Sequence, residues 1–149
     1  MSGFDADLAA AQEALVRAMT AGGPMPAGFD AGAVRAAAHG ILLKRAGEVA
    51  RSWPALAGSY GTSWKAVFAR WAAERPTQGS FRDGFDFARS RRGGLSGDAA
   101  RELDLAEIRW SYDGASPPRP RRAAVRRVGG GVAVQFRGRV RTFRGGSRG

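Results

Sequence analysis

The spacing of apolar side chains predicts a chain that is helical over its first three quarters. Apolar residues fall at i, i+3, i+4 and i+7 in the clearest segment, which places them on one helix face and in the core: Trp64, Val67, Phe68 and Trp71. Weaker patterns of the same kind are separated by glycine- and proline-containing breaks. We therefore predict a mainly α fold, with a bundle of about six short helices forming a helical domain over residues 5–114.

Individual residues mark where some of these helices begin or weaken. Asp30 precedes an apolar run and is placed to cap its helix, because a short carboxylate side chain accepts hydrogen bonds from free backbone N–H groups. Pro54 suits a first helical turn, where its missing N–H costs nothing. Gly40 and Gly47 lie inside the predicted second helix, where they either weaken it or allow close packing.

The pattern changes after residue 114. A proline-rich segment at 115–122 predicts a stiff connector. Residues 124–128 and 132–137 then alternate as strands do and are joined through the glycines at 129–131, while residues 139–144 fit a third strand turned at 137–138. We predict a small C-terminal antiparallel β-hairpin or three-stranded sheet over 123–144, followed by a frayed tail at 145–149.

Charge is concentrated in the same C-terminal region. The net charge is +11, yet the segment 117–149 holds ten arginines and no acidic residue. The first 116 residues carry 14 basic and 13 acidic side chains, so this part of the chain is almost neutral. A cationic segment attached to a neutral body predicts an anionic partner, which is an acidic protein or peptide, nucleic acid or an anionic lipid surface.

The sequence offers little for catalysis or metal binding. It has no cysteine and a single histidine, His39, which we interpret as a surface residue or one whose hydrogen bonds are satisfied within the fold. Asp83 and Asp86 resemble a carboxylate pair, but Asp83 falls in the first turn of a predicted helix, where the helix dipole favours it. We predict a protein that is not an enzyme, with no catalytic residues, no metal site and no cofactor.

The expected location is cytoplasmic. No apolar run approaches the roughly 20 residues that a membrane span needs. The first seven residues include two aspartates and lack the basic-then-apolar order of a signal peptide.

The candidate binding residues lie in the predicted sheet. Val132, Val134 and Phe136 share one face of the middle strand, because side chains alternate along a strand. Exposed arginines on such a sheet either capture phosphates directly or meet acidic side chains of an extended peptide that adds as a strand. The residues assigned to peptide or partner binding are Arg126, Arg127, Val132, Val134, Phe136, Arg137, Arg139 and Arg141.

Two segments carry a family resemblance. The run KRAGEVARSWPALAGSYGTSWKAVFARWAAERPTQGSFRDGFDFAR at residues 44–89, followed by ELDLAEIRWSYDG at 102–114, resembles a group of small actinobacterial proteins. That group is similar to a broader family labelled DNA-binding, which includes the small partner subunit of methanobactin biosynthesis. The shared order is Trp-Pro, an aromatic helix, an Asp-Gly-x-x-Phe helix and a late Glu-x-x-Trp helix, and the resemblance extends over roughly residues 5–143.

The resemblance implies a non-catalytic partner of a multinuclear non-haem iron-dependent oxidase that modifies ribosomally made peptides. Such a partner is itself free of metal, and iron is expected only in the oxidase. It presents the leader of an acidic precursor peptide along a C-terminal β-element, a position that residues 123–144 match.

The alternative is a nucleic-acid-binding protein of the transcription-regulator kind. The charge and the family label favour it. The predicted helix at 96–112 does not, because Glu102, Asp104 and Glu107 make it too acidic to lie in a DNA groove.

Overall fold

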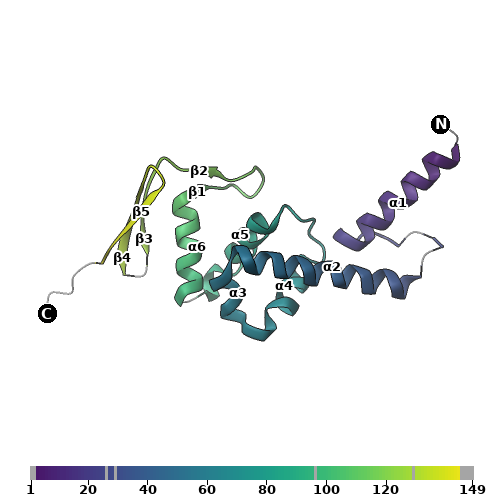
Figure 1. Cartoon of the computed structure of the whole chain (residues 1–149), viewed down its shortest axis with the longest axis horizontal. Helices are drawn as coiled ribbons and strands as arrows, with labels where there is room; N and C mark the ends of the chain where they lie inside the picture. The colour runs from purple at the N-terminus through teal and green to yellow at the C-terminus, as the bar shows by residue number, and fades with distance from the viewer. Residues whose placement is uncertain (1–2, 26, 29, 96, 129, 145–149) are drawn as a thin grey trace.

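The computed structural model describes residues 3–25, 27, 28, 30–95, 97–128 and 130–144, and within these the predicted mainly α fold with a C-terminal sheet is confirmed (Figure 1). The α-helices are α1 Gly3–Ala21, α2 Ala31–Ser52, α3 Pro54–Tyr60, α4 Trp64–Ala72, α5 Ser80–Ser90 and α6 Gly97–Arg109. Three-residue 3₁₀ helices follow α3 and α5. No helix in these ranges is both long and apolar enough to cross a membrane.

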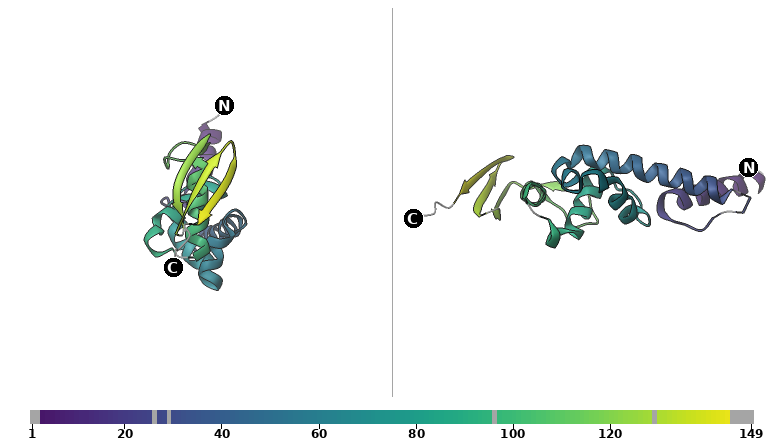
Figure 2. Two further views of the ribbon diagram at one scale, coloured as in Figure 1. Left: turned by 90° about the vertical axis from the view of Figure 1, so that its left-hand side faces the viewer. Right: turned by 90° about the horizontal axis from the view of Figure 1, so that it is seen from below.

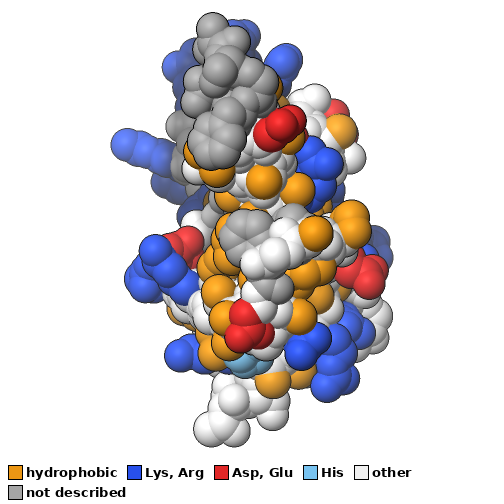
Figure 3. Space-filling view, turned by 90° about the vertical axis from the view of Figure 1, so that its right-hand side faces the viewer, with side chains coloured by type: hydrophobic (Ala, Val, Ile, Leu, Met, Phe, Trp, Pro, Cys, Tyr) orange, Lys and Arg blue, Asp and Glu red, His pale blue; other side chains and the backbone are white. Residues whose placement is uncertain are grey.

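The molecule is elongated, because α1 and the first half of α2 lie side by side and extend away from the other helices, while the second half of α2 packs among them (Figures 1 and 2). Viewed from that end, hydrophobic side chains are visible between charged ones (Figure 3). Leu8, Val16 and Ile41 are among the exposed large apolar residues of these two helices. His39 is exposed on α2, where its prediction as a surface residue is confirmed.

The core is built mainly from aromatic side chains of α4 and α5, which pack against Ala46 and Val49 of α2. Phe68, Phe85 and Phe87 are completely buried, and Trp64 is 5% exposed. The predicted burial of Trp64 and Phe68 is therefore confirmed. Trp71 is only partly buried, and its ring lies 4.9 Å from the guanidinium carbon of Arg75, a cation–π arrangement at the edge of the core.

Trp53 occupies the junction of α2 and α3 and is 1% exposed. Its indole nitrogen donates a hydrogen bond to the carbonyl of Phe81 at 2.9 Å, and its ring packs edge-on against Phe85. A Cβ on Gly84 would lie 2.2 Å from the Trp53 ring. Glycine at this position of α5 therefore lets the helix backbone rest directly on the indole.

A buried ion pair joins α2 to the start of α5. The guanidinium of Arg45 donates from Nε to Asp83 at 2.7 Å, and both side chains are less than 10% exposed. The other Asp83 oxygen accepts a hydrogen bond from the backbone N–H of Gln78 at 3.0 Å, and Thr77 donates to the carboxylate at 2.7 Å. The helix-terminal interpretation of Asp83 is confirmed, but its partner Arg45 was not predicted, since the two lie 38 residues apart.

The predicted starts of α2 and α3 are confirmed. Asp30 caps α2, accepting from the backbone N–H groups of Gly32 and Ala33, and Pro54 is the first residue of α3. A Cβ on Gly40 or Gly47 would meet nothing within 4 Å. These two glycines therefore weaken α2 without providing close packing.

The chain after α6 forms two small antiparallel sheets. In the first, β1 (Trp110–Ser111) pairs with β2 (Arg119–Pro120). The predicted connector at 115–122 therefore folds back on the end of α6, where the N–H of Arg121 donates to the carbonyl of Arg109 at 2.8 Å. Sequence patterns did not predict this pair, because two-residue strands carry no detectable alternation.

The second sheet has three strands in the order β3-β4-β5, which confirms the three-stranded alternative. The strands are β3 Ala123–Val128, β4 Gly131–Phe136 and β5 Arg139–Arg144. Arg137 and Gly138 connect the last two with φ of 48° and 81°, the positive values that a tight hairpin turn requires. Residue 129 of the predicted glycine turn and the predicted tail at 145–149 lie outside the described residues.

Candidate binding surface

The three-stranded sheet has one face toward α6 and one toward solvent, and Figure 2 (left) looks onto it with the helices behind. Register decides which side chains share a face, because cross-strand partners point to the same side. Val125 pairs with Val134, which in turn pairs with Arg141. We call the solvent-facing side the outer face; its members are Ala123, Val125, Arg127, Val132, Val134, Phe136, Arg139, Arg141 and Phe143.

The outer face combines exposed apolar side chains with arginines. Val125 is 72% exposed, Phe136 61% and Phe143 57%, which is unusual for residues of this size. A shallow hollow of about 200 Å³ lies among Val134, Phe136, Arg139, Arg141 and Phe143. The guanidinium groups of Arg127, Arg139 and Arg141 have no carboxylate partner among the described residues.

Six of the eight predicted binding residues lie together on the outer face: Arg127, Val132, Val134, Phe136, Arg139 and Arg141. Arg137 lies in the turn between β4 and β5, with its guanidinium carbon 5.4 Å from the centre of the Phe136 ring. Arg126 points the other way, toward α6. Phe143 and Val125 belong to the same surface but were not assigned to it, because strand register was needed to place them.

The inner face rests on α6 through a small apolar cluster. Val128 and Ala133 pack on Ile108, and all three are 6% exposed or less. Beside them the side-chain amide of Gln135 donates to the carbonyl of Arg121 at 2.8 Å. The sheet is therefore held against the last helix by apolar contact and by hydrogen bonding.

An ion cluster on α6 completes this contact. Glu107 is 9% exposed and forms salt bridges with Arg89, Arg92 and Arg126. Burial acts to raise the pKa of Glu107, but hydrogen bonds from Arg92 and Arg89 and the charge of Arg126 outweigh it, so the pKa is lowered. Arg126 therefore joins β3 to α6 and is not available on the outer face.

Asp83 and Asp86 line the same hollow but are held by different partners. The carboxylate of Asp86 accepts a hydrogen bond from the hydroxyl of Tyr112 at 2.9 Å, while Asp83 is held by Arg45. Burial, only partly offset by that hydrogen bond and by the charges of Arg89 and Arg82, raises the pKa of Asp86. Within the described ranges, no three His, Asp or Glu side chains gather in a way that could hold a metal ion.

Comparisons with known proteins identify relatives but assign no activity. A "UPF0276 protein" of Streptomyces avermitilis is 34% identical over 113 residues, which is 74% of this chain. The matched part is 23% of that protein, so the chain spans about a quarter of the relative's length. No solved structure matches significantly. The model of the family described as "SCO6045-like, C-terminal domain" matches residues 9–93, more than half of the chain, and the chain belongs to this family.

Proposed function

We propose that this chain is a non-catalytic partner protein that binds an acidic precursor peptide on its C-terminal sheet and presents it to a multinuclear iron-dependent oxidase. The observation that carries the proposal is the outer face, where exposed valine and phenylalanine side chains lie beside three arginines that have no carboxylate partner in the described part of the chain. An extended peptide that presents both acidic and apolar side chains on one of its faces is complementary to such a surface.

The open edge of the sheet supports this mode of binding. Strand β5 pairs with β4 on one side and with no other strand in the described part of the chain. A peptide that adds beside β5 gains main-chain hydrogen bonds, and its side chains then lie next to Arg139, Arg141 and Phe143. Acidic side chains at alternate positions would form charge-assisted hydrogen bonds with the two arginines.

The size of the Streptomyces relative supports a larger partner. Because the matched segment is only 23% of that protein, a related segment occurs there in one chain with a much larger remainder. By analogy, we propose that this chain acts together with a larger protein or domain. The identity of that protein as an iron-dependent oxidase rests on the family resemblance of residues 44–89 and 102–114. The same resemblance implies that the iron is held by the oxidase.

The test is a pull-down at moderate salt with nuclease, using the full chain and an Arg139→Gln/Arg141→Gln variant. An Arg35→Gln/Arg70→Gln variant is the matched control, because both arginines are exposed on α2 and α4 and the charge change is the same. We expect the wild type and the control to retain an iron-containing oxidase or a short acidic peptide, and the sheet variant to lose the peptide.

Two outcomes would contradict the proposal. Equal capture of the peptide by all three proteins would exclude the outer face as the binding surface. Loss of all bound material on nuclease treatment would indicate that the chain binds nucleic acid and not a peptide.

One observation favours a second candidate function, binding of single-stranded nucleic acid. Phe136 and Phe143 are exposed on the same face as Arg127, Arg139 and Arg141, and exposed rings beside arginines are typical of surfaces that stack bases. Binding to an oligothymidylate that weakens steeply with rising salt would support this candidate.

A further inference from the structure

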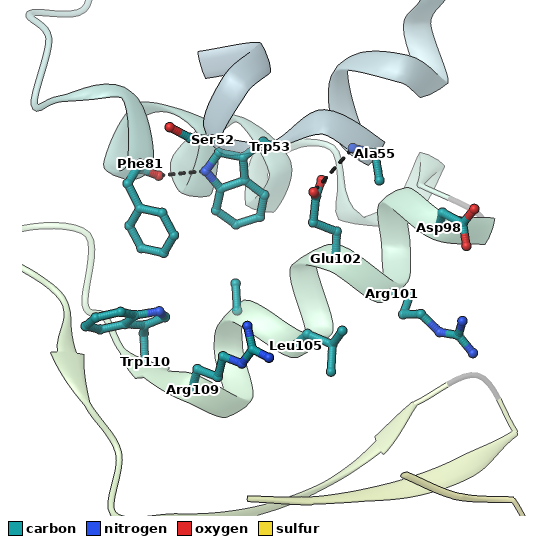
Figure 4. Close-up of a pocket in the computed structure, with 11 residues that line it drawn as sticks. Ser52, Trp53, Ala55, Phe81, Asp98, Arg101, Glu102, Leu105, Arg109 and Trp110 are labelled. Carbon is teal, nitrogen blue, oxygen red and sulfur yellow. Dashed lines mark hydrogen bonds between the residues drawn. The ribbon is translucent and has the colours of Figure 1, made fainter. Parts of the chain in front are cut away.

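A second concave site lies away from the outer face of the sheet. A groove of about 410 Å³ forms where the end of α2 and the start of α3 meet α5 and α6 (Figure 4). One side of the groove is formed by α6, from residue 98 to residue 109. Ile108 and Glu107, which contact the sheet, do not line the groove, so the groove and the sheet lie on different faces of this helix. The volume lies at the small end of ligand sites in proteins, which fits a large side chain with a little adjoining backbone.

One wall of the groove is aromatic and rigid. The rings of Trp53 and Phe81 stack with centroids 5.5 Å apart, and Trp110 meets Phe81 edge-on at 5.6 Å. The hydrogen bond from the Trp53 indole to the Phe81 carbonyl fixes the orientation of the first ring. A wall that is fixed before binding costs little ordering entropy, so it favours a large apolar group.

The α6 side of the groove carries free positive charge. Arg101, Leu105 and Arg109 follow one another at intervals of four, so they form a single line along the helix (Figure 4). Both arginines are exposed, and neither has a salt-bridge partner among the residues that the structure describes.

Glu102, a carboxylate of the groove lining, forms no salt bridge with either arginine. Glu102 accepts hydrogen bonds from the backbone N–H groups of Ala55 at 3.2 Å and Leu56 at 2.7 Å, at the start of α3. Figure 4 shows its side chain directed toward α3 and away from the two guanidinium groups. Its charge is therefore used to stabilise a helix N-terminus, and Asp98 at one end is the other acidic residue of the lining.

We propose that this groove binds a short acidic peptide segment, which inserts one large apolar side chain against Trp53, Phe81 and Trp110 while flanking carboxylates bind Arg101 and Arg109. An aromatic wall beside two unpaired guanidinium groups is complementary to that combination. The site shares no residue with the outer face, so it stands or fails independently of the function proposed for the sheet.

The experiment uses the full chain and the labelled peptide Ac-GSDEFEDSG-NH2, with affinity measured by fluorescence anisotropy at low and moderate salt. Two control peptides replace its phenylalanine with alanine or its acidic residues with their amides. The groove variants are Arg101→Gln/Arg109→Gln and Leu105→Asp. Leu105 lies outside the buried clusters, and an aspartate there would lie one helical turn from each arginine, where it would compete with the carboxylates of the peptide.

We expect each groove variant and each control peptide to bind at least about tenfold more weakly than the wild-type pair. The Arg35→Gln/Arg70→Gln variant should bind the peptide as the wild type does, and the Arg139→Gln/Arg141→Gln variant measures how much of the binding belongs to the outer face. Absence of binding to the wild type, or binding that the groove variants keep, would overturn the proposal. If only the Arg139→Gln/Arg141→Gln variant loses binding, the peptide binds the outer face and not the groove. That result would overturn the groove proposal and leave the proposed function intact.

Discussion

Replacing Gly84 with alanine should destabilise the protein, although the same change inside a helix normally stabilises it. Alanine is favoured over glycine in a helix interior by up to about 1 kcal/mol. Gly84 is the fifth residue of α5 and is completely enclosed, and a Cβ there would lie 2.2 Å from Cδ1 and 2.4 Å from Nε1 of Trp53. Ordinary carbon–carbon contact begins near about 3.5 Å, so the indole or the helix would have to move by about 1.3 Å.

That movement has two costs. The Trp53 indole would leave its hydrogen bond to the Phe81 carbonyl, and a buried donor without a partner costs about 1–3 kcal/mol. Forced repacking of the surrounding rings costs a further 1–3 kcal/mol or so. After the gain in helix propensity is subtracted, we expect Gly84→Ala to lower the free energy of unfolding by about 3 kcal/mol.

The assay is urea unfolding followed by far-ultraviolet circular dichroism, with an unchanged denaturant slope as the condition for comparison. The matched control is Gly40→Ala, because Gly40 lies in the middle of α2 and a Cβ there meets nothing within 4 Å. The control should gain about 0.5–1 kcal/mol. In a Trp53→Leu background the penalty at Gly84 should shrink, since the smaller side chain can give way. If Gly84→Ala were as stable as Gly40→Ala, the argument from close approach would be refuted.

Three further predictions use the same measurements. Asp83→Ala leaves the guanidinium of Arg45 charged and buried without its partner, so the free energy of unfolding measured in urea should fall by about 3–5 kcal/mol. Little or no change in that free energy would show that the ion pair is not needed for stability. The pKa of Glu107 is lower in the folded protein than in the unfolded chain, so its ionised carboxylate stabilises the fold above the unfolded pKa, and this stabilisation is lost as pH falls through the folded pKa. Glu107→Gln should therefore reduce the loss of stability below pH 4.5. An unchanged dependence of stability on pH would contradict the role of the ion cluster. Phe68→Ala should cost about 3–5 kcal/mol and more than Trp71→Ala, because Phe68 is fully buried and Trp71 only partly, and the reverse order would place the core elsewhere.

The amino-acid sequence determined the fold class and most of the helix positions, because both depend on local periodicity. Apolar spacing placed Trp64 and Phe68 in the core, and Asp30 and Pro54 fixed where two helices begin. Alternation and glycine-containing turns likewise predicted the strands of the C-terminal sheet to within about one residue at each end. The concentration of arginines after residue 116 needed no structure at all.

Tertiary structure decided the contacts between residues far apart in the chain. Arg45 reaches Asp83 across 38 positions, and nothing in the neighbourhood of either residue specifies the other. The reason for glycine at position 84 is likewise the Trp53 ring of another helix.

The same holds for the candidate sites. Alternation along β4 predicted that Val132, Val134 and Phe136 share a face. The pairing register was needed to place Phe143 on the same face, and the folded structure was needed to show that Arg126 points toward Glu107. The groove between α6 and the aromatic wall has no signature in the sequence, because helices distant along the chain form it. Local periodicity is encoded by neighbours in the chain, whereas a binding surface depends on which faces the folded helices and strands turn toward one another.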